Sequence, residues 1–153
     1  MTDLAVTAGE IIDESLYMVL GTADEAGRPW VSPVYFAVSG YSEFFWVSLP
    51  DARHSRNLAV RPEVSIVVFD SGVPIGTGQG VYMAARAEEL SGSELERGIE
   101  VFSQRGQEHG GRAWSAADVQ VPAPHRLFRA SVTQHWTLDP TAKPGDQRTL
   151  ISP

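Results

Sequence analysis

The chain contains no cysteine among its 153 residues. This absence excludes disulfide bonds, thiolate nucleophiles and cysteine-ligated metal sites, and it is typical of proteins from a reducing cytosol. Long apolar runs are also missing, since no stretch approaches the roughly 18 residues of a membrane-spanning helix. Residues 1–10 lack the basic start of a signal peptide. We therefore expect a cytoplasmic protein with no membrane partner.

Positive charge is scarce in this sequence. Lysine and arginine total 12 residues against 19 aspartates and glutamates, which gives a formal net charge of −7. Affinity for nucleic acid comes mainly from neutralising phosphates, so this balance argues against a nucleic-acid partner. The length and the 42% hydrophobic content predict one globular domain over residues 1–153, and there is no internal repeat.

The few cations are concentrated in one short segment. Four potential cations fall within nine residues: Arg53, His54, Arg56 and Arg61. Asp51 or Ser55 can cap a short helix here and Pro62 can end it, which places the cluster at a helix N-terminus. Backbone N–H groups and the helix dipole at such a terminus favour a phosphate. The alternative is a solvated basic turn that pairs with some of the acidic residues.

Aromatic and β-branched segments separated by turn signals predict a mainly β fold. We expect strands over residues 16–22, 29–38, 43–48, 64–69, 78–90 and 125–138. The run 64–69 is too apolar for a surface strand and is predicted to lie centrally in a sheet. Strands in meander order predict an antiparallel β-barrel with short helices, because closure of a barrel removes exposed edges.

Helices are predicted between these strands. Helical spacing indicates short helices near residues 8–16 and 51–62. Ser91 and Glu94 form a capping-box signature before a further helix that ends near Gly106. Residues 106–124 are rich in Gly, Ala and Pro and predict a long loop, and the tail 139–153, with three prolines, is expected to be loosely held.

Several other kinds of site are not indicated. His109, His125 and His135 lack the spacing of metal ligands, so no metal site is predicted. Residues 76–80 have the glycines of a dinucleotide-binding loop but precede a strand, whereas such a loop opens a helix. No serine lies in a recognisable nucleophile motif, which argues against a hydrolase.

Six short segments occur in an order and spacing that resemble a known family: 27–34, 45–48, 52–54, 62–65, 79–81 and 129–132, followed by Trp136. Residues 52–54 lie eight residues ahead of Pro62, which is the spacing of a Ser-Arg-Lys phosphate-binding triplet in that family. The chain is similar, from about residue 16 to residue 138, to the pyridoxamine 5'-phosphate oxidase-like, FMN-binding split-barrel family.

This resemblance implies an antiparallel, homodimeric split barrel that binds FMN at the dimer interface. It would place the flavin phosphate against Arg53 and His54, and Trp136 would reach the site from the other subunit. The other residues implied at the flavin are Ser32, Pro33, Val34, Tyr35, Val47, Ser48 and Gln79. The implied activity is that of an oxidoreductase acting on a small organic substrate. Because the flavin carries the chemistry, no catalytic acid or base is required.

The chain also departs from the family pattern. His54 stands where a lysine is usual and is a weaker cation at pH 7. Ser32 replaces an arginine and Ala37 a lysine of the vitamin oxidases, and no Arg-x-His segment follows Trp136. These differences argue against pyridoxamine 5'-phosphate oxidase activity itself.

Two alternatives stay open beside an FMN oxidoreductase. The first is a reductase that uses the deazaflavin coenzyme F-420, whose polyglutamate tail would be met by further basic residues such as Arg28 and Arg56. The second is a flavin- or haem-binding protein without turnover, used for storage, sensing or stress response.

Overall fold

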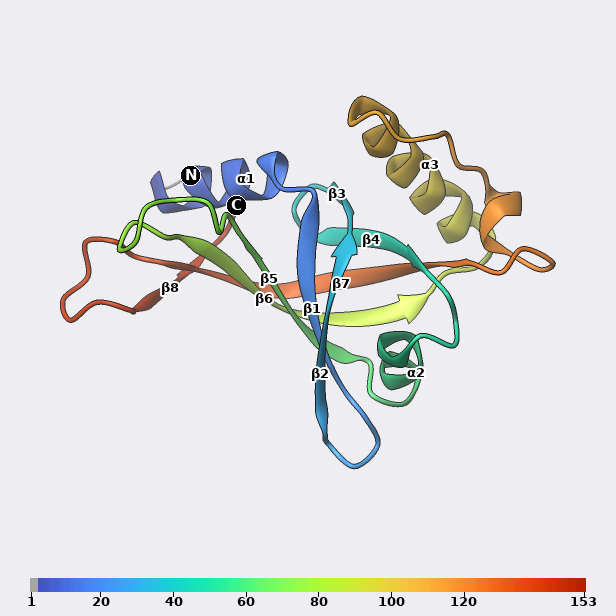
Figure 1. Ribbon diagram of the computed structural model, residues 1–153, viewed down its shortest axis with the longest axis horizontal. Coiled ribbons are helices and arrows are strands. Elements are labelled where there is room, and N and C mark those ends of the chain that lie inside the picture. The colour runs from blue at the N-terminus through green and yellow to red at the C-terminus, as the bar shows by residue number, and fades with distance from the viewer. Residues whose placement is uncertain (1–2) are drawn as a thin grey trace.

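A computed structural model describes residues 3–153 of the chain (Figure 1). The elements are α1 Asp3–Glu14, β1 Tyr17–Ala23, β2 Pro29–Tyr35, β3 Ala37–Ser39, β4 Glu43–Ser48, α2 Arg53–Val60, β5 Glu63–Phe69, β6 Gly80–Glu89, α3 Gly92–Glu108, the 3-10 helix η1 Ala116–Val119, β7 Arg126–Leu138 and β8 Arg148–Ile151. All strands form one antiparallel sheet in the order β2-β1-β5-β6-β7-β4-β3, with β8 paired to β7. The predicted mainly β, antiparallel fold with inserted helices is confirmed.

The sheet curls so strongly that its two ends approach each other. β2 and β3 lie at opposite ends of the strand order, yet they are joined through the single residue Phe36. The Phe36 side chain is fully buried and its N–H donates to the carbonyl of Leu16 at 3.3 Å. The strand expected over 29–38 is therefore broken at Phe36, because its first part pairs with β1 and its last part with β4.

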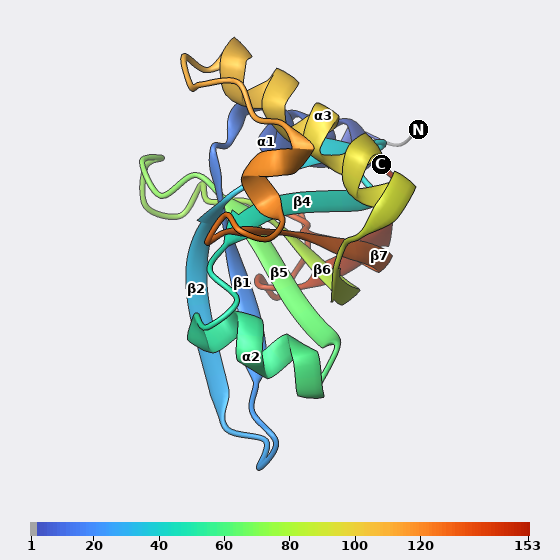
Figure 2. The ribbon, with the colours of Figure 1, turned by 90° about the vertical axis from the view of Figure 1, so that its right-hand side faces the viewer.

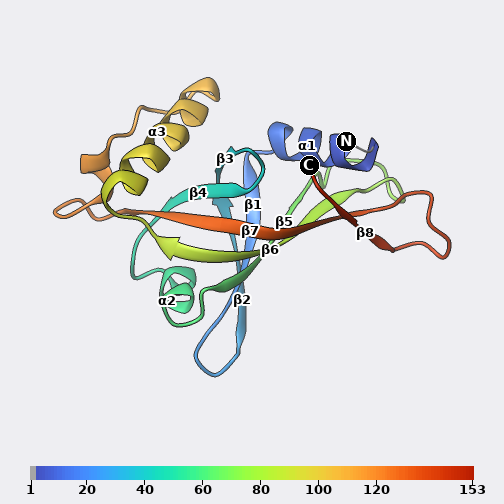
Figure 3. The ribbon, with the colours of Figure 1, turned by 180° about the vertical axis from the view of Figure 1, so that it is seen from behind.

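The helices cover different parts of this curled sheet. In Figures 1 and 3, α1 and α3 lie on one side of the long strands β6 and β7, and α2 lies on the other side beside the projecting β1–β2 hairpin. Figure 2 shows α2 and α3 at opposite ends of the strands. β5 lies between β1 and β6, which is the central position predicted for it.

Large apolar side chains fill the inward face of the sheet. Leu20, Ile66 and Met83 from β1, β5 and β6 are at most 2% exposed. Trp46 of β4 is fully buried and stacks on Phe128 of β7, with ring centroids 5.8 Å apart. Such close packing of inward side chains forms the main core.

A second core lies under α3. Phe45 points to the opposite side of β4 from Trp46 and packs with Leu95, Ile99 and Leu127. β4 therefore contributes alternate residues to two cores and is buried on both faces. This explains why the sequence 43–48 shows no polar alternation.

The helix ends differ in part from the sequence prediction. Ala52, not Asp51 or Ser55, is the N-cap of α2, and no side chain caps this end. The Ser55 hydroxyl instead donates to the carbonyl of Leu49 at 2.8 Å. Ser91 does precede α3 but makes no side-chain capping bond.

The segments expected to be irregular hold more structure than predicted. α3 continues past Gly106 to Glu108, and η1 lies within the expected loop 106–124. The tail 139–153 was expected to be loosely held, but its residues 148–151 form β8 and bury Ile151 against the main core. Pairing with β7 supplies backbone hydrogen-bond partners that local sequence cannot reveal.

The contact between α3 and the sheet gives a first testable prediction. A Cβ atom added at Gly98 would lie 2.9 Å from the Phe45 ring and 3.0 Å from Leu127. We expect Gly98→Ala to lower the free energy of unfolding by about 1–3 kcal/mol through overpacking, although alanine favours helices.

Gly106 is the matched control in the same helix. Its added Cβ would meet nothing closer than 3.9 Å. Gly106→Ala is expected to raise stability by up to about 1 kcal/mol through helix propensity alone. Urea unfolding measures the free energy of unfolding of each variant relative to the wild type. If both substitutions raised this free energy, or both lowered it, the tight contact at Gly98 would be contradicted.

Candidate functional site

The N-terminus of α2 is fixed in place by polar contacts to neighbouring strands. The Asn57 side-chain amide donates to the Thr22 hydroxyl at 3.1 Å, and both residues are buried. The Ser55 bond to Leu49 anchors the turn between β4 and α2. The first turn of the helix therefore stands at a defined position with its N–H groups uncapped by any side chain.

His54 is held beside the end of β4. Its Nε2 atom lies 2.9 Å from the Ser48 hydroxyl, so the two predicted site residues are in hydrogen-bond contact. Burial lowers the pKa of the His54 imidazole below its ordinary value. His54 is therefore neutral at pH 7. Its ring can donate a hydrogen bond to the Ser48 hydroxyl or accept one from it, depending on the tautomer, and it adds no positive charge to the α2 terminus.

Arg53 is the exposed cation of the same turn. Its guanidinium lies 4.2 Å from the centroid of the Trp30 ring, an arrangement that orients the group while leaving its N–H donors free. Within residues 3–153, neither Arg53 nor Arg56 forms an ion pair. Both arginines can therefore receive an anion.

The other nearby arginines have structural partners. Arg61 donates to the carbonyls of Asp24 and Glu25 at 2.8 and 3.1 Å and so ties the end of α2 to the β1–β2 turn. Arg28 forms an ion pair with Asp24 at 3.2 Å. Within the basic segment, Arg61 thus has a structural role, whereas Arg53 and Arg56 have no acidic partner in residues 3–153.

The residues predicted on β2 do not share one face. Ser32 and Val34 are buried on the inward face, opposite Leu20 and Met18 of β1. Pro33 points outward beside Val19, and Tyr35 packs edge-on against Phe102 of α3 with ring centroids 5.5 Å apart. On β4, Val47 packs against the second core and only Ser48 reaches His54.

Gln79 and Trp136 lie away from the α2 cluster. Gln79 is the last residue of the loop that joins β5 to β6, and it lines a hollow with Leu16 and Phe69. Trp136 lies on the outward face of the sheet, opposite Tyr82 in the β6–β7 register. The structure therefore brings together Ser48, Arg53 and His54, and leaves Trp136 on the other face of the sheet.

The sequence did not single out Tyr82, Val67 and Val19, which complete this outward face between Trp136 and Pro33. Trp136, Tyr82, Val67, Val19 and Pro33 are register partners across successive strands, so they form one row. Side chains alternate between the two faces along each strand, and this alternation in the sequence could have indicated that these residues point outward. On β8, Leu150 pairs with Trp136 and continues the row, and Arg148 pairs with Leu138. Neither residue had a local signal, because their positions depend on the return of the tail.

No group of three or more His, Cys, Asp or Glu in the described part of the chain could hold a metal ion. None of the helices in residues 3–153 is both long and apolar enough to cross a membrane.

Comparison with protein families identifies the chain. Residues 7–139 match the family model described as pyridoxamine 5'-phosphate oxidase, which is more than half of the sequence. The chain belongs to this family, and its curled sheet is the split barrel found in its structural relatives. Comparison with curated proteins gives no significant match.

Solved structures support the fold assignment. A haem-binding protein from Mycobacterium smegmatis has a TM-score of 0.75 at 19% identity, covering 99% of this chain but only 59% of that one. HutZ, a haem storage protein from Vibrio cholerae, has a TM-score of 0.66 at 26% identity, covering 87% and 92% of the two chains. A coenzyme F-420 reductase has a TM-score of 0.60 at 16% identity, covering 82% and 93%.

The buried histidine gives a prediction about pH and stability. Because the folded-state pKa of His54 lies below its unfolded value, the full stability is present above the unfolded pKa of about 6.5 and is lost as pH falls through the folded pKa. His54→Gln cannot take up this proton. We expect the stability of the wild type relative to His54→Gln to decrease as pH falls from about 7.5 to about 5.

Urea unfolding of the two proteins at a series of pH values measures this difference. Carboxylates that titrate in the same experiment are common to both proteins and cancel in the comparison. A stability difference that stays constant over this range would show that His54 is no more buried than a free histidine.

Proposed function

We propose that the protein binds FMN across a homodimer and acts as an oxidoreductase on a small organic substrate. The bound flavin would supply hydride or electron transfer, and the protein would supply binding, orientation and electrostatics. The observation that carries this proposal is that the two predicted parts of the site lie on opposite faces of one sheet. They can meet only if a second chain contributes one of them.

The phosphate half of the site fits the first turn of α2. Uncapped backbone N–H groups, the unpaired guanidinium of Arg53 and the dipole of the helix all favour an anion at this point. Arginine offers a bidentate fork to phosphate. Ser48 and neutral His54 add hydrogen-bonding groups beside it.

The second half is proposed to come from the outward face of the partner. This face exposes several large apolar side chains, among them Tyr17 at 61%, Val31 at 65% and Leu150 at 59%. A continuous apolar face of this kind is typical of a protein interface. Burying it against a second copy would bring the Trp136 row of one chain toward the α2 cluster of the other.

We do not propose pyridoxamine 5'-phosphate oxidase turnover, although the chain belongs to that family. Ala37, which stands in place of a lysine, is fully buried in the second core. Ser32, which stands in place of an arginine, is 9% exposed and faces inward. Neither position can present a cation to a substrate phosphate without disturbing the packing.

Two other ligands are favoured by specific observations. The similarity to a coenzyme F-420 reductase and the unpaired Arg56 support a deazaflavin. The similarity to haem-binding and haem storage proteins supports a haem. The absorption spectrum of the purified protein, with mass spectrometry of the released small molecule, distinguishes these three ligands, and oxidised-flavin maxima with FMN released are the result expected here.

The role of Arg53 is tested by removing its charge. We expect Arg53→Ala to weaken FMN binding by about 1.5–3 kcal/mol, the range for hydrogen bonds to charged groups, without loss of the fold. Arg28→Ala is the matched control, because Arg28 already pairs with Asp24 in the neighbouring turn. Titration calorimetry measures both affinities, and equal FMN affinity for wild type and Arg53→Ala would remove Arg53 from the site.

The dimer is tested by placing a charge on the outward face. Val31→Lys would bury an unpaired ammonium in the proposed interface, so we expect the dimer to dissociate about 100-fold more readily and FMN binding to fall with it. Val60→Lys is the control, because Val60 is 58% exposed at the end of α2, away from this face.

Sedimentation velocity with and without FMN measures both effects. A wild-type monomer that binds FMN with one flavin per chain would contradict the shared site. Dissociation of Val60→Lys to the same extent as Val31→Lys would show that the outward face is not the interface.

A further inference from the structure

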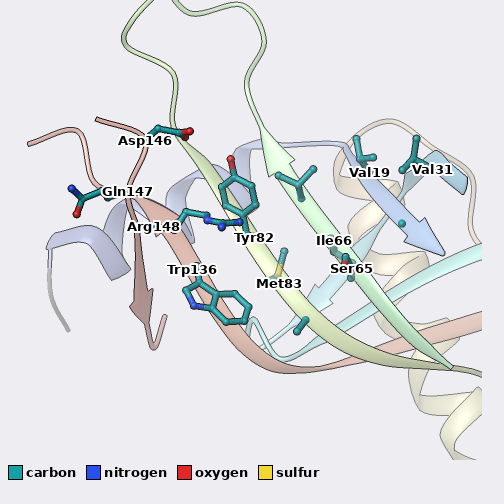
Figure 4. Close-up of a pocket in the computed structure, with 13 residues that line it drawn as sticks. Val19, Val31, Ser65, Ile66, Tyr82, Met83, Trp136, Asp146, Gln147 and Arg148 are labelled. Atoms are coloured by element: carbon teal, nitrogen blue, oxygen red, sulfur yellow. The ribbon is translucent and has the colours of Figure 1, made fainter. Parts of the chain in front are cut away.

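A groove runs along α3 beside the segment that follows this helix and turns back along it (Figure 1). It has a volume of about 780 Å³ and is lined by α3 residues between Glu96 and Glu108 and by residues 114–116. It shares no residue with the hollow beside Trp136 on the outward face, which is shown in Figure 4 and would be covered in the proposed dimer. The groove therefore belongs to a different surface from the proposed interface.

One wall of the groove is a row of hydrogen-bond acceptors on α3, which we call the acceptor row. Its members follow one another at every fourth position: Glu96, Glu100, Gln104 and Glu108. Residues four apart lie on the same side of a helix and about 6 Å apart along its axis, so the row extends over about 18 Å. A row of this length can contact several positive groups of one ligand at once.

The floor and the second wall of the groove are apolar. Ile99 is 4% exposed and lines the floor with Ala116, and both residues pack in the second core. The Trp114 ring packs edge-on against Phe102, with ring centroids 5.7 Å apart. The Trp114 backbone N–H donates to the Ser103 hydroxyl at 2.8 Å. The Trp114 wall is therefore fixed in place against α3.

The negative charge of the acceptor row is not neutralised within the groove. The lining described in residues 3–153 contains no lysine, arginine or histidine. In the same part of the chain, neither Glu96 nor Glu100 forms an ion pair. Arg112 lies over the Trp114 ring, but it is itself paired with Asp118 at 3.5 Å. The groove thus combines free carboxylates with an apolar floor.

We propose that this groove docks a basic, amphipathic segment of a partner protein. Lysine or arginine side chains of the segment would pair with the acceptor row, and its apolar side chains would lie on Ile99, Trp114 and Ala116. Complementary charge across an interface directs association and fixes the register of the partners. A simple cation would leave the apolar floor unused, so the lining favours a segment that carries both kinds of side chain.

Two labelled peptides that differ in charge test the docking. The first carries a fluorescein label and the repeat Lys-Lys-Leu, and the second carries the repeat Gln-Gln-Leu in its place. Fluorescence anisotropy measures the binding of each peptide to the full chain without added flavin. We expect the affinity of the lysine peptide to fall as the salt concentration rises, and the glutamine peptide to bind at least about tenfold more weakly.

Paired substitutions on two helices separate the groove from the general negative charge of the chain. Glu96→Gln combined with Glu100→Gln is expected to weaken binding of the lysine peptide about tenfold. Glu10→Gln combined with Glu14→Gln is the matched control, because these are also exposed glutamates four positions apart, on α1 and outside the groove. The control changes the net charge equally and is expected to change the affinity by less than about twofold.

Two further measurements test the acceptor row and the floor. Gln104→Lys places a positive charge in the middle of the row, so it is expected to weaken binding more than the α1 control does, although it changes the net charge less. A peptide with the repeat Lys-Lys-Ser is expected to bind about fivefold more weakly than the leucine peptide, because it cannot use the apolar floor.

Several results would overturn the proposal. These are equal losses of affinity in the α3 and α1 double variants, and equal affinities of the leucine and serine peptides. Displacement of the lysine peptide by spermine at an equal concentration would assign the groove to small polyamines instead. The proposal rests on the groove alone, so peptide binding by a chain that binds no FMN would uphold it while refuting the proposed function.

Discussion

The inward face of the sheet is completely filled, and this packing determines where every other side chain of the sheet can lie. Leu20, Ile66, Met83 and Trp46 occupy the interior with almost no exposure. Because side chains alternate along a strand, the residues between them must point outward. The apolar row that ends at Trp136 is therefore the direct consequence of the core packing, and a lone chain has no further layer with which to cover it.

Polar contacts of α3 connect this helix to α1 and to β4. Arg105 donates to the carbonyls of Ile12 and Ser15 at 3.1 and 2.7 Å, so a cation of α3 satisfies the C-terminal end of α1. Hydrogen bonds from Arg97 hold the pKa of the Glu43 carboxyl below its ordinary value and link α3 to β4. These contacts tie α3 to α1 and to β4, so α3 covers the face of β4 opposite the main core, whereas α1 packs into the main core.

Sequence patterns could predict most of the helices and strands, but not how all of the strands pair with one another. The strands and helices follow from periodicity, and the contact of His54 with Ser48 follows from their closeness in the chain. The break at Phe36 and the strand β8 depend on pairing between distant segments, which no local pattern encodes. For the same reason Trp136 could be singled out by resemblance, whereas Arg148, twelve positions later along a tail with several prolines, could not.

The distribution of charge differs between the α2 cluster and the outward face of the sheet. The α2 terminus presents Arg53 and uncapped N–H groups, which suit a doubly charged phosphate. On the outward face, Arg148 lies over the ring of Tyr82, at 5.4 Å from its centroid. In the proposed function, a neutral His54 beside the α2 terminus would leave phosphate affinity to fixed donors instead of a titrating charge. Because the α2 cluster and the Trp136 row lie on opposite faces of the sheet, substitutions in one need not disturb the other or the core between them.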